Sequence, residues 1–259
     1  MRVLVLLLSA TFVFCSTSLA SQVYRNTFDN EDSLEDFTIH RKYNPLDTVS
    51  IESGQLRLET DSLGTVCLSL DASSFEEPYN TTLSQNSGIV SWSFNISNEN
   101  YKYNNSFSFV LVNTAEDPFD ISGHGYCFNG GGMVGDRMGI WRFDYGTGGG
   151  SKVLIDITDG LGVLPEKGSF RITYSPADDM WSLFGEIGSD YVDPEQVTNF
   201  LGSAVDATYT STNTSYLSIT SGNTGNSYFD NVTISVIPEP ATLFLLTLGV
   251  IFAGRKRKS

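Results

Sequence analysis

Apolar and polar residues alternate in many short stretches of the chain between residues 21 and 237. In residues 89–96, for example, valine, tryptophan, phenylalanine and isoleucine alternate with serine and asparagine. A period of two places successive side chains on opposite faces of a strand, so one face of such a strand would be buried. We predict strands at residues 55–59, 65–70, 89–96, 106–112, 138–145, 153–157, 170–174, 181–187, 216–220 and 228–236.

Ten or more short strands, separated by turn residues, predict an all-β fold in which two antiparallel sheets pack as a sandwich or close as a barrel. Neither a repeat nor a linker divides this stretch, so we expect one β-sandwich domain over residues 21–236. A single short helix is expected at residues 193–201, because an Asp-Pro-Glu sequence supplies a cap and then a proline at the first position. The glycine-rich stretches at residues 122–139 and 146–150 are expected to be loops.

The N-terminus has the organisation of a secretory signal peptide. A positive charge at Arg2 precedes an apolar run at residues 3–14, and Ser18 and Ala20 are small residues at the positions a signal peptidase requires. We therefore expect residues 1–20 to be removed by cleavage after Ala20 during export. The alternative is an N-terminal membrane anchor, for which the apolar run is short.

The C-terminus carries a second apolar segment. Residues 241–253 contain no charge, and Arg255, Lys256, Arg257 and Lys258 follow closely. Thirteen helical residues span roughly 20 Å, less than a hydrocarbon core of about 30 Å, although tilt and flanking residues can cover part of that difference. The basic cluster would stay on the cytoplasmic side, so we expect the body outside and the tail inside.

The tail resembles a known sorting signal. Pro238, Glu239 and Pro240 precede the apolar segment and the terminal basic cluster, an order and spacing similar to the bacterial PEP-CTERM signal over residues 237–259. The resemblance implies recognition by an exosortase after passage through the export machinery, cleavage near the Pro-Glu-Pro sequence, and only transient residence in the inner membrane. It also implies delivery to the cell surface or an exopolysaccharide matrix. The alternative is an ordinary tail anchor.

The body resembles concanavalin A-like, laminin-G-like jelly rolls in its layout. Residues 167–188 form a strand, a turn and a strand, and a final strand at residues 228–237 runs directly into the sorting signal. The segment at residues 24–40 would provide the first strand. The resemblance implies that the first and last strands pair. A galactose-binding-type or other sandwich is the alternative.

Charge narrows the range of partners. The whole chain has 30 acidic and 15 basic residues, and residues 21–237 hold 29 acidic and only 10 basic residues, a formal charge of −19. A body this acidic is a poor partner for nucleic acid and for other anionic polymers. Polysaccharide ligands, if they bind, are expected to be neutral or bridged by a cation.

No catalytic motif stands out in the sequence. A glycosidase needs two carboxylates about 5–9.5 Å apart, and Asp156 and Asp159 would point to opposite faces of a strand. His40 and His124 have no zinc-ligand spacing with a cysteine, and no serine stands in a nucleophile elbow. We therefore expect a non-catalytic protein that binds or scaffolds polysaccharide. The alternatives are an exported glycoside hydrolase or lyase with dispersed acids, and a purely structural coat protein.

Two further features concern stability and metal binding. Cys67 and Cys127 are expected to form a disulfide in an oxidising compartment, with two free buried thiols as the alternative. Asp29 and Asp32 would approach Asp230 if the terminal strands pair, and oxygen ligands of this kind suit Ca²⁺. Solvated surface acids are the alternative reading of that cluster.

Sugar binding requires exposed aromatic rings. Trp92 and Trp181 share their strand faces with aliphatic and aromatic residues and are expected in the core. Trp141 lies beside glycine-rich loops and is the first candidate for stacking against a glycan. Tyr101 and Tyr103, in an asparagine-rich loop, are weaker candidates.

Overall fold

The computed structural model describes most of the predicted body of the protein. The described residues are 20–61, 64–99, 106–118, 120, 122–130, 137–144, 151–158, 167–222 and 225–238. The predicted signal peptide before Ala20, the predicted membrane segment at residues 241–253, the basic cluster and both Tyr101 and Tyr103 lie outside them. Within the described residues, no helix combines the length and apolar character needed to cross a membrane.

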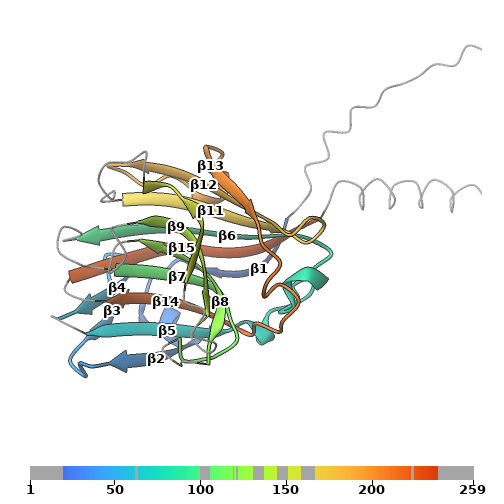
Figure 1. The fold of residues 1–259 in the computed structure, drawn as a ribbon. Coiled ribbons are helices and arrows are strands. Elements are labelled where there is room, and N and C mark those ends of the chain that lie inside the picture. Colours follow the sequence, from blue (N-terminus) through green and yellow to red (C-terminus); the bar gives the residue numbers. More distant parts are fainter. Residues whose placement is uncertain are drawn as a thin grey trace, which may run out of the picture.

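The described chain forms fifteen strands and short 3-10 turns (Figure 1). The strands are β1 (Ser21–Asn26), β2 (Phe37–Lys42), β3 (Thr48–Glu52), β4 (Gln55–Thr60), β5 (Thr65–Asp71), β6 (Gly88–Glu99), β7 (Ser106–Asn113), β8 (His124–Gly130), β9 (Met138–Asp144), β10 (Lys152–Asp156), β11 (Lys167–Ser175), β12 (Met180–Gly188), β13 (Phe200–Val205), β14 (Tyr216–Gly222) and β15 (Gly225–Pro238). The 3-10 turns are η1 (Glu31–Leu34), η2 (Ala72–Ser74), η3 (Leu83–Gln85) and η6 (Pro194–Gln196).

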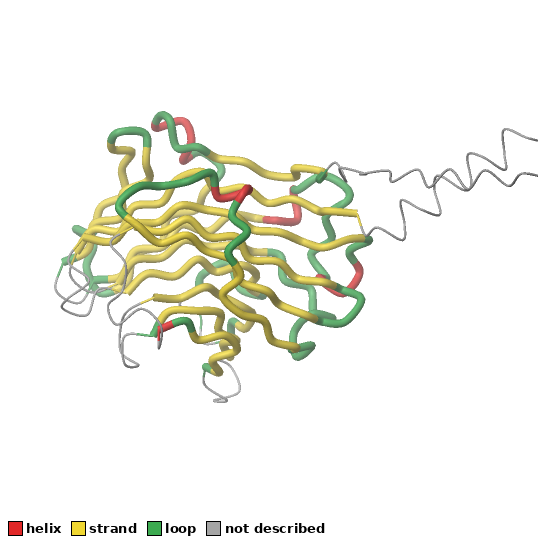
Figure 2. The backbone as a smooth tube through the Cα atoms, turned by 90° about the horizontal axis from the view of Figure 1, so that it is seen from above, coloured by secondary structure: helices red, strands yellow, loops and turns green. Residues whose placement is uncertain are grey.

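These strands form two antiparallel sheets, which confirms the predicted sandwich. The eight-stranded sheet has the order β13-β12-β11-β6-β15-β4-β3, with β1 also paired to β15, and the seven-stranded sheet has the order β10-β9-β8-β7-β14-β5-β2. Figure 2 shows the strands of the sandwich running side by side between two ends formed by loops. The architecture is that of a jelly roll, because strands adjacent in a sheet are often distant in sequence.

The core lies between the sheets and is built from the predicted alternation. Phe94 of β6 stacks on Phe109 of β7 with ring centroids 4.4 Å apart, and Trp92 stacks on Trp181 at 5.9 Å. All four side chains are fully buried, which confirms the core assignment of both tryptophans. Each such aromatic side chain stabilises the fold by about 2–3 kcal/mol through its burial.

The last strand, β15, pairs with two strands from the N-terminal part of the domain. The first half of β15 pairs with β4, and its second half pairs with β1, from Ser21 opposite Val236 to Asn26 opposite Val232. The register against β6 shifts between Asp230 and Thr233, where Asn231 adopts a φ of 50°. The predicted pairing of the first and last strands is therefore confirmed.

Two expected elements differ from the structure. The glycine-rich stretch at residues 122–139 contains β8, whose Tyr126 and Phe128 are fully buried, so the glycine content concealed an apolar alternation. The expected helix at residues 193–201 is only the turn η6. Asp193 caps it as predicted, but Phe200 already begins β13 because that strand pairs with β12.

Candidate functional site

A hydrogen-bonded polar cluster fills one end of the sandwich, centred on Asp206. This residue begins the β13–β14 connection (residues 206–215) and is 7% exposed. Tyr126 of β8 donates its hydroxyl to Asp206 Oδ1 at 2.8 Å, and the Thr208 amide donates to the same oxygen at 3.0 Å. Arg142 of β9 donates from Nη1 to Asp206 Oδ2 at 2.6 Å. Both carboxylate oxygens are thus engaged.

The electrostatics of this cluster keep Asp206 ionised. Burial disfavours its charged form, but the hydrogen bonds from Tyr126 and Thr208 and the charge of Arg142 outweigh burial and lower the pKa of Asp206. Burial raises the pKa of Tyr126, so its hydroxyl keeps the proton that it donates. The hydrogen bond from Tyr126 and the ion pair with Arg142 therefore attach the connection at residues 206–215 to the seven-stranded sheet.

A group of partly exposed side chains surrounds this buried centre. The Tyr209 hydroxyl donates to Asp144 Oδ2 at 2.5 Å, and the Tyr209 ring lies 4.5 Å from the His124 ring. The Tyr209 amide donates to the Tyr126 hydroxyl at 3.1 Å, which links the surface residues to the buried cluster. We call this surface group the Tyr209 patch; it comprises His124, Arg142, Asp144, Thr208 and Tyr209.

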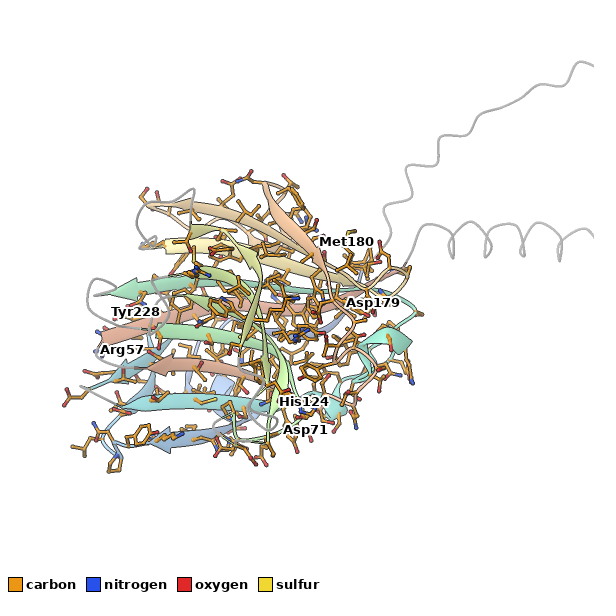
Figure 3. The ribbon with its side chains drawn as sticks, in the orientation of Figure 1. Arg57, Asp71, His124, Asp179, Met180 and Tyr228 are labelled. Carbon is orange, nitrogen blue, oxygen red and sulfur yellow. The ribbon has the colours of Figure 1, made fainter. Side chains whose placement is uncertain are left out.

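The patch combines the chemical groups that suit recognition of a sugar. Aromatic rings pack on the apolar face of a pyranose, while carboxylate, guanidinium and hydroxyl groups hydrogen-bond to its hydroxyls. Burial, followed by the neighbouring Asp144 carboxylate, raises the pKa of Tyr209 to about 12, so Tyr209 remains a neutral donor. Figure 3 shows His124 toward the same end of the sandwich as Asp71 and Asp179, and Arg57 and Tyr228 toward the other.

The predicted disulfide between Cys67 and Cys127 is wrong. Cys67 lies in β5 and Cys127 in β8, with β14 and β7 between them in the same sheet. Three strand spacings amount to about 14 Å, twice the largest Cα separation of about 7 Å that a disulfide spans. Both thiols are free and buried, and burial raises the pKa of Cys127 to about 12 and that of Cys67 as well.

The predicted stacking role of Trp141 is also contradicted, because the residue is only 5% exposed. Trp141 and Phe143 share one face of β9, whereas Ile140, directly before Trp141, faces the main core. Trp141 instead packs in a small second cluster with Val110, Cys127, Phe143 and Val153. Its ring therefore cannot lie flat against a glycan in this conformation.

The predicted Ca²⁺ site is not assembled in the part of the chain that the structure describes. No group of three or more His, Cys, Asp or Glu residues there could hold a metal ion. Asp29 does lie close enough to Asp230 to influence its ionisation, as the pairing of the terminal strands predicted. Asp32 belongs to η1, outside the β1–β15 pair that brings the other two residues together.

Asp230 itself has an unusual environment on the outer face of the eight-stranded sheet. Burial, reinforced by the Asp29 carboxylate, raises its pKa to about 6, and the Asn231 amide that donates to it at 2.7 Å only partly offsets this. Asn95 lies directly opposite in the register with β6, and its buried Oδ1 has no hydrogen-bond donor. The donors to this carboxyl are the backbone amide and the side-chain amide of Asn231, at 2.7 and 2.9 Å, and no cation contributes to its pKa.

Sequence reasoning missed the central residues of the patch. Asp206 and Tyr209 lie in a connection with no recognisable motif, and no sequence feature singles out Arg142 or Asp144. His124 was expected in a loop but begins β8. The available signal is the alternation of Ile140, Arg142 and Asp144 on the core-facing side of β9, because charged side chains on that side need partners.

Comparison with solved structures places the fold in a class of lectin-like jelly-roll β-sandwiches. The CBM2 module of the evolved Dit of Lactobacillus casei BL23 phage J-1 is 10% identical, over 85% of this chain and 97% of that one, with a TM-score of 0.51. The basic winged bean lectin, solved with Tn-antigen, is 9% identical over 83% and 98%, also at 0.51. The binding domain of botulinum neurotoxin DC, solved with rat synaptotagmin II, is 10% identical over 89% and 51%, at 0.50. At these identities the likeness establishes the fold alone.

The C-terminal segment is the part that a family model recognises. Residues 236–258 match the PEP-CTERM protein-sorting motif, which confirms the resemblance found in the sequence. The motif indicates an exported protein that an exosortase sorts at the cell envelope. Comparison with curated proteins gives no match.

Proposed function

We propose that this protein is a non-catalytic glycan-binding protein of the cell surface or extracellular matrix, and that the Tyr209 patch is its binding site. The observation that carries the proposal is the partly exposed Tyr209–His124 ring pair, 4.5 Å apart, beside Asp144 and Arg142. The sorting motif supports delivery to the surface, where extracellular polysaccharide would be available.

The buried cluster would hold the patch ready for a ligand. Arg142 is fixed by Asp206, and Tyr209 is fixed at its amide by Tyr126 and at its hydroxyl by Asp144. Side chains that are already ordered lose little conformational entropy on binding, which matters for a weakly held sugar. A fixed geometry of this kind favours recognition of one arrangement of hydroxyls over others.

The charge of the domain limits the ligand. The exported body carries a formal charge of −19, so an acidic polysaccharide would be repelled unless a cation bridged the two. We therefore propose a neutral polysaccharide as the ligand. Asp206 has a lowered pKa, and both of its carboxylate oxygens accept hydrogen bonds. A carboxylate held ionised in this way is unsuited to act as a general acid, which supports a binding role for the site.

A glycan array tests the proposal, using residues 21–238, which include every described strand. The array is probed with and without Ca²⁺, and Tyr209→Ala and Asp144→Asn are compared with Phe200→Ala, which alters an exposed aromatic residue on another strand. We expect the first two variants to lose binding at least 10-fold and Phe200→Ala to bind normally.

Three results would contradict the proposal. The first is an array without signal, and the second is binding that survives both patch variants. The third is release of reducing sugar from a polymer that is abolished by Asp144→Asn, because that would establish an enzyme at the same place.

A further inference from the structure

The sorting tail leaves the folded domain at the end that carries the Tyr209 patch. β15 ends at Pro238, which pairs with Gly88 at the start of β6. In the other sheet, the start of β8 at His124 lies beside the end of β9 at Asp144. The connection at residues 206–215 runs between the two sheets at this end and contributes Tyr209 itself.

No spacer separates the domain from the sorting motif. The motif begins at Val236, which is 1% exposed and pairs with both Val90 and Ser21. Only Glu239 and Pro240 stand between Pro238 and the first residue of the uncharged segment. Three residue steps reach at most about 11 Å, and the interfacial layer of a bilayer is itself about 5–8 Å deep on each side.

We infer that the inserted tail holds this end of the sandwich against the membrane, so that the Tyr209 patch is covered until the exosortase removes the tail. As a statement about glycan binding, this inference rests on the proposed function of the patch. As a statement about orientation, it depends only on where the described chain ends and on the shortness of the segment that follows. Processing would then release the protein and expose its binding site in one step.

The acidic surface at this end of the sandwich favours release of the domain from the membrane after cleavage. Four of the connections at this end, at residues 72–87, 114–123, 176–179 and 206–215, together contain eight acidic residues and neither lysine nor arginine. Anionic lipid headgroups repel such a surface over a distance of about one Debye length. Once the covalent link is cut, nothing in these connections attracts the domain back to the bilayer.

Accessibility to a bulky reagent tests the orientation without any glycan. Residues 21–259 are inserted into phosphatidylcholine–phosphatidylglycerol vesicles, with Ala207→Cys at the patch end or Ser189→Cys beyond the opposite end of β12. Both positions are exposed, and the native Cys67 and Cys127 are buried. We expect a 5-kDa maleimide-polyethylene glycol to modify Ala207→Cys at least 10-fold more slowly than Ser189→Cys in vesicles, and at a similar rate in residues 21–238.

A spacer provides the matched control. Twenty Gly/Ser residues and a second proline, inserted between Pro238 and Glu239, preserve the Pro-Glu-Pro sequence and add about 25 Å of reach. We expect the spacer to equalise the two rates and to restore binding of the best neutral glycan from the array to the anchored chain. Equal rates without the spacer would overturn the orientation. Absence of glycan binding by residues 21–238 would instead contradict the proposed function and leave the rate comparison valid.

Discussion

Among the buried and partly buried aspartates of this sandwich, Asp206 and Asp230 have surroundings that shift their pKa values in opposite directions. Asp206, at the end of the sandwich, has a lowered pKa, whereas Asp230, on the outer face of the eight-stranded sheet, has a pKa of about 6. Burial on its own would raise the pKa of both carboxyls. The difference comes from the partners. Asp206 accepts hydrogen bonds from a tyrosine hydroxyl, a backbone amide and a guanidinium. Asp230 accepts hydrogen bonds only from the neutral amides of Asn231, and it lies near the Asp29 carboxylate.

The comparison shows how one acidic protein can use charge for two purposes. A buried carboxylate with a full set of donors organises a surface, and here it holds the Tyr209 patch in place. A half-buried carboxylate without a cation costs stability at neutral pH. We therefore expect substitutions at the two positions to have opposite signs.

The largest effect is expected from Asp206→Ala. The substitution leaves Arg142 and Tyr126 without their buried partner, which should lower the free energy of unfolding by about 3 kcal/mol. Urea denaturation of residues 21–238 at pH 7 measures this change, with Asp190→Ala at an exposed position as the control. A loss below about 0.5 kcal/mol, the usual range for a surface substitution, would show that the cluster does not stabilise this end of the sandwich.

Arg142→Met separates the charge from the rest of the cluster. Asp206 would keep the Tyr126 and Thr208 hydrogen bonds but lose its counter-charge, so we expect a loss of about 2 kcal/mol at pH 7. In the native protein the lowered pKa of Asp206 stabilises the fold above the unfolded-state pKa of about 3.9, and this stabilisation disappears as the pH falls through the folded-state pKa. The penalty of the variant should therefore shrink below pH 4. A penalty that is independent of pH would contradict the role of charge.

Asp230→Asn should stabilise the protein. Because the folded-state pKa of about 6 exceeds the unfolded value, the native state binds more protons between pH 4 and 6, and its stability falls as the pH rises through that range. Allowing for solvent screening of a half-exposed group, we expect a gain of about 1 kcal/mol at pH 7 and almost none at pH 4. Thermal unfolding of the two proteins across pH 4–7.5 measures the difference, and Asp29→Asn should give part of the same gain. Destabilisation by Asp230→Asn at pH 7 would contradict the expectation that substitutions at Asp206 and Asp230 have opposite effects on stability.

The smallest effect is expected from Tyr209→Phe. This substitution removes the hydrogen bond to Asp144 but keeps the ring against His124, so the free energy of unfolding should fall by about 0.5–1 kcal/mol. Stacking of a sugar on the ring should persist, and affinity for the array ligand should fall less than in Tyr209→Ala. Identical losses of affinity in the two variants would assign the recognition to the hydroxyl rather than the ring.

Much of the fold could be predicted from the sequence because the alternation in strands such as β6 is regular. The pairing of the terminal strands and the burial of Trp92 and Trp181 also follow from pattern alone. The prediction failed at β8, where glycine content suggested a loop, and at β13, where a capping sequence suggested a longer helix. In both places pairing with a neighbouring strand overrode the local preference.

The candidate site could not be predicted in the same way. Tyr126 and Arg142 are paired on the neighbouring strands β8 and β9, but Asp206 lies 64 residues beyond Arg142, and only the folding of the sandwich brings it to them. Trp141 was selected for its residue type and neighbouring glycines, but the same alternation that puts Arg142 toward Asp206 puts Trp141 into a buried cluster. The prediction of a Cys67–Cys127 disulfide failed for a related reason, because sequence distance does not reveal how many strands lie between two residues in a sheet.

The most direct test of the account is to map the ligand onto the domain by NMR. Isotope-labelled residues 21–238 are titrated with the neutral oligosaccharide that gives the strongest array signal, and changes in amide chemical shift are followed. We predict that the largest changes cluster at His124, Arg142, Asp144, Thr208 and Tyr209, and that they vanish in Tyr209→Ala while its spectrum remains that of a folded protein. Changes confined to another surface, such as the outer face around Phe184 and Phe200, would contradict the assignment of the site.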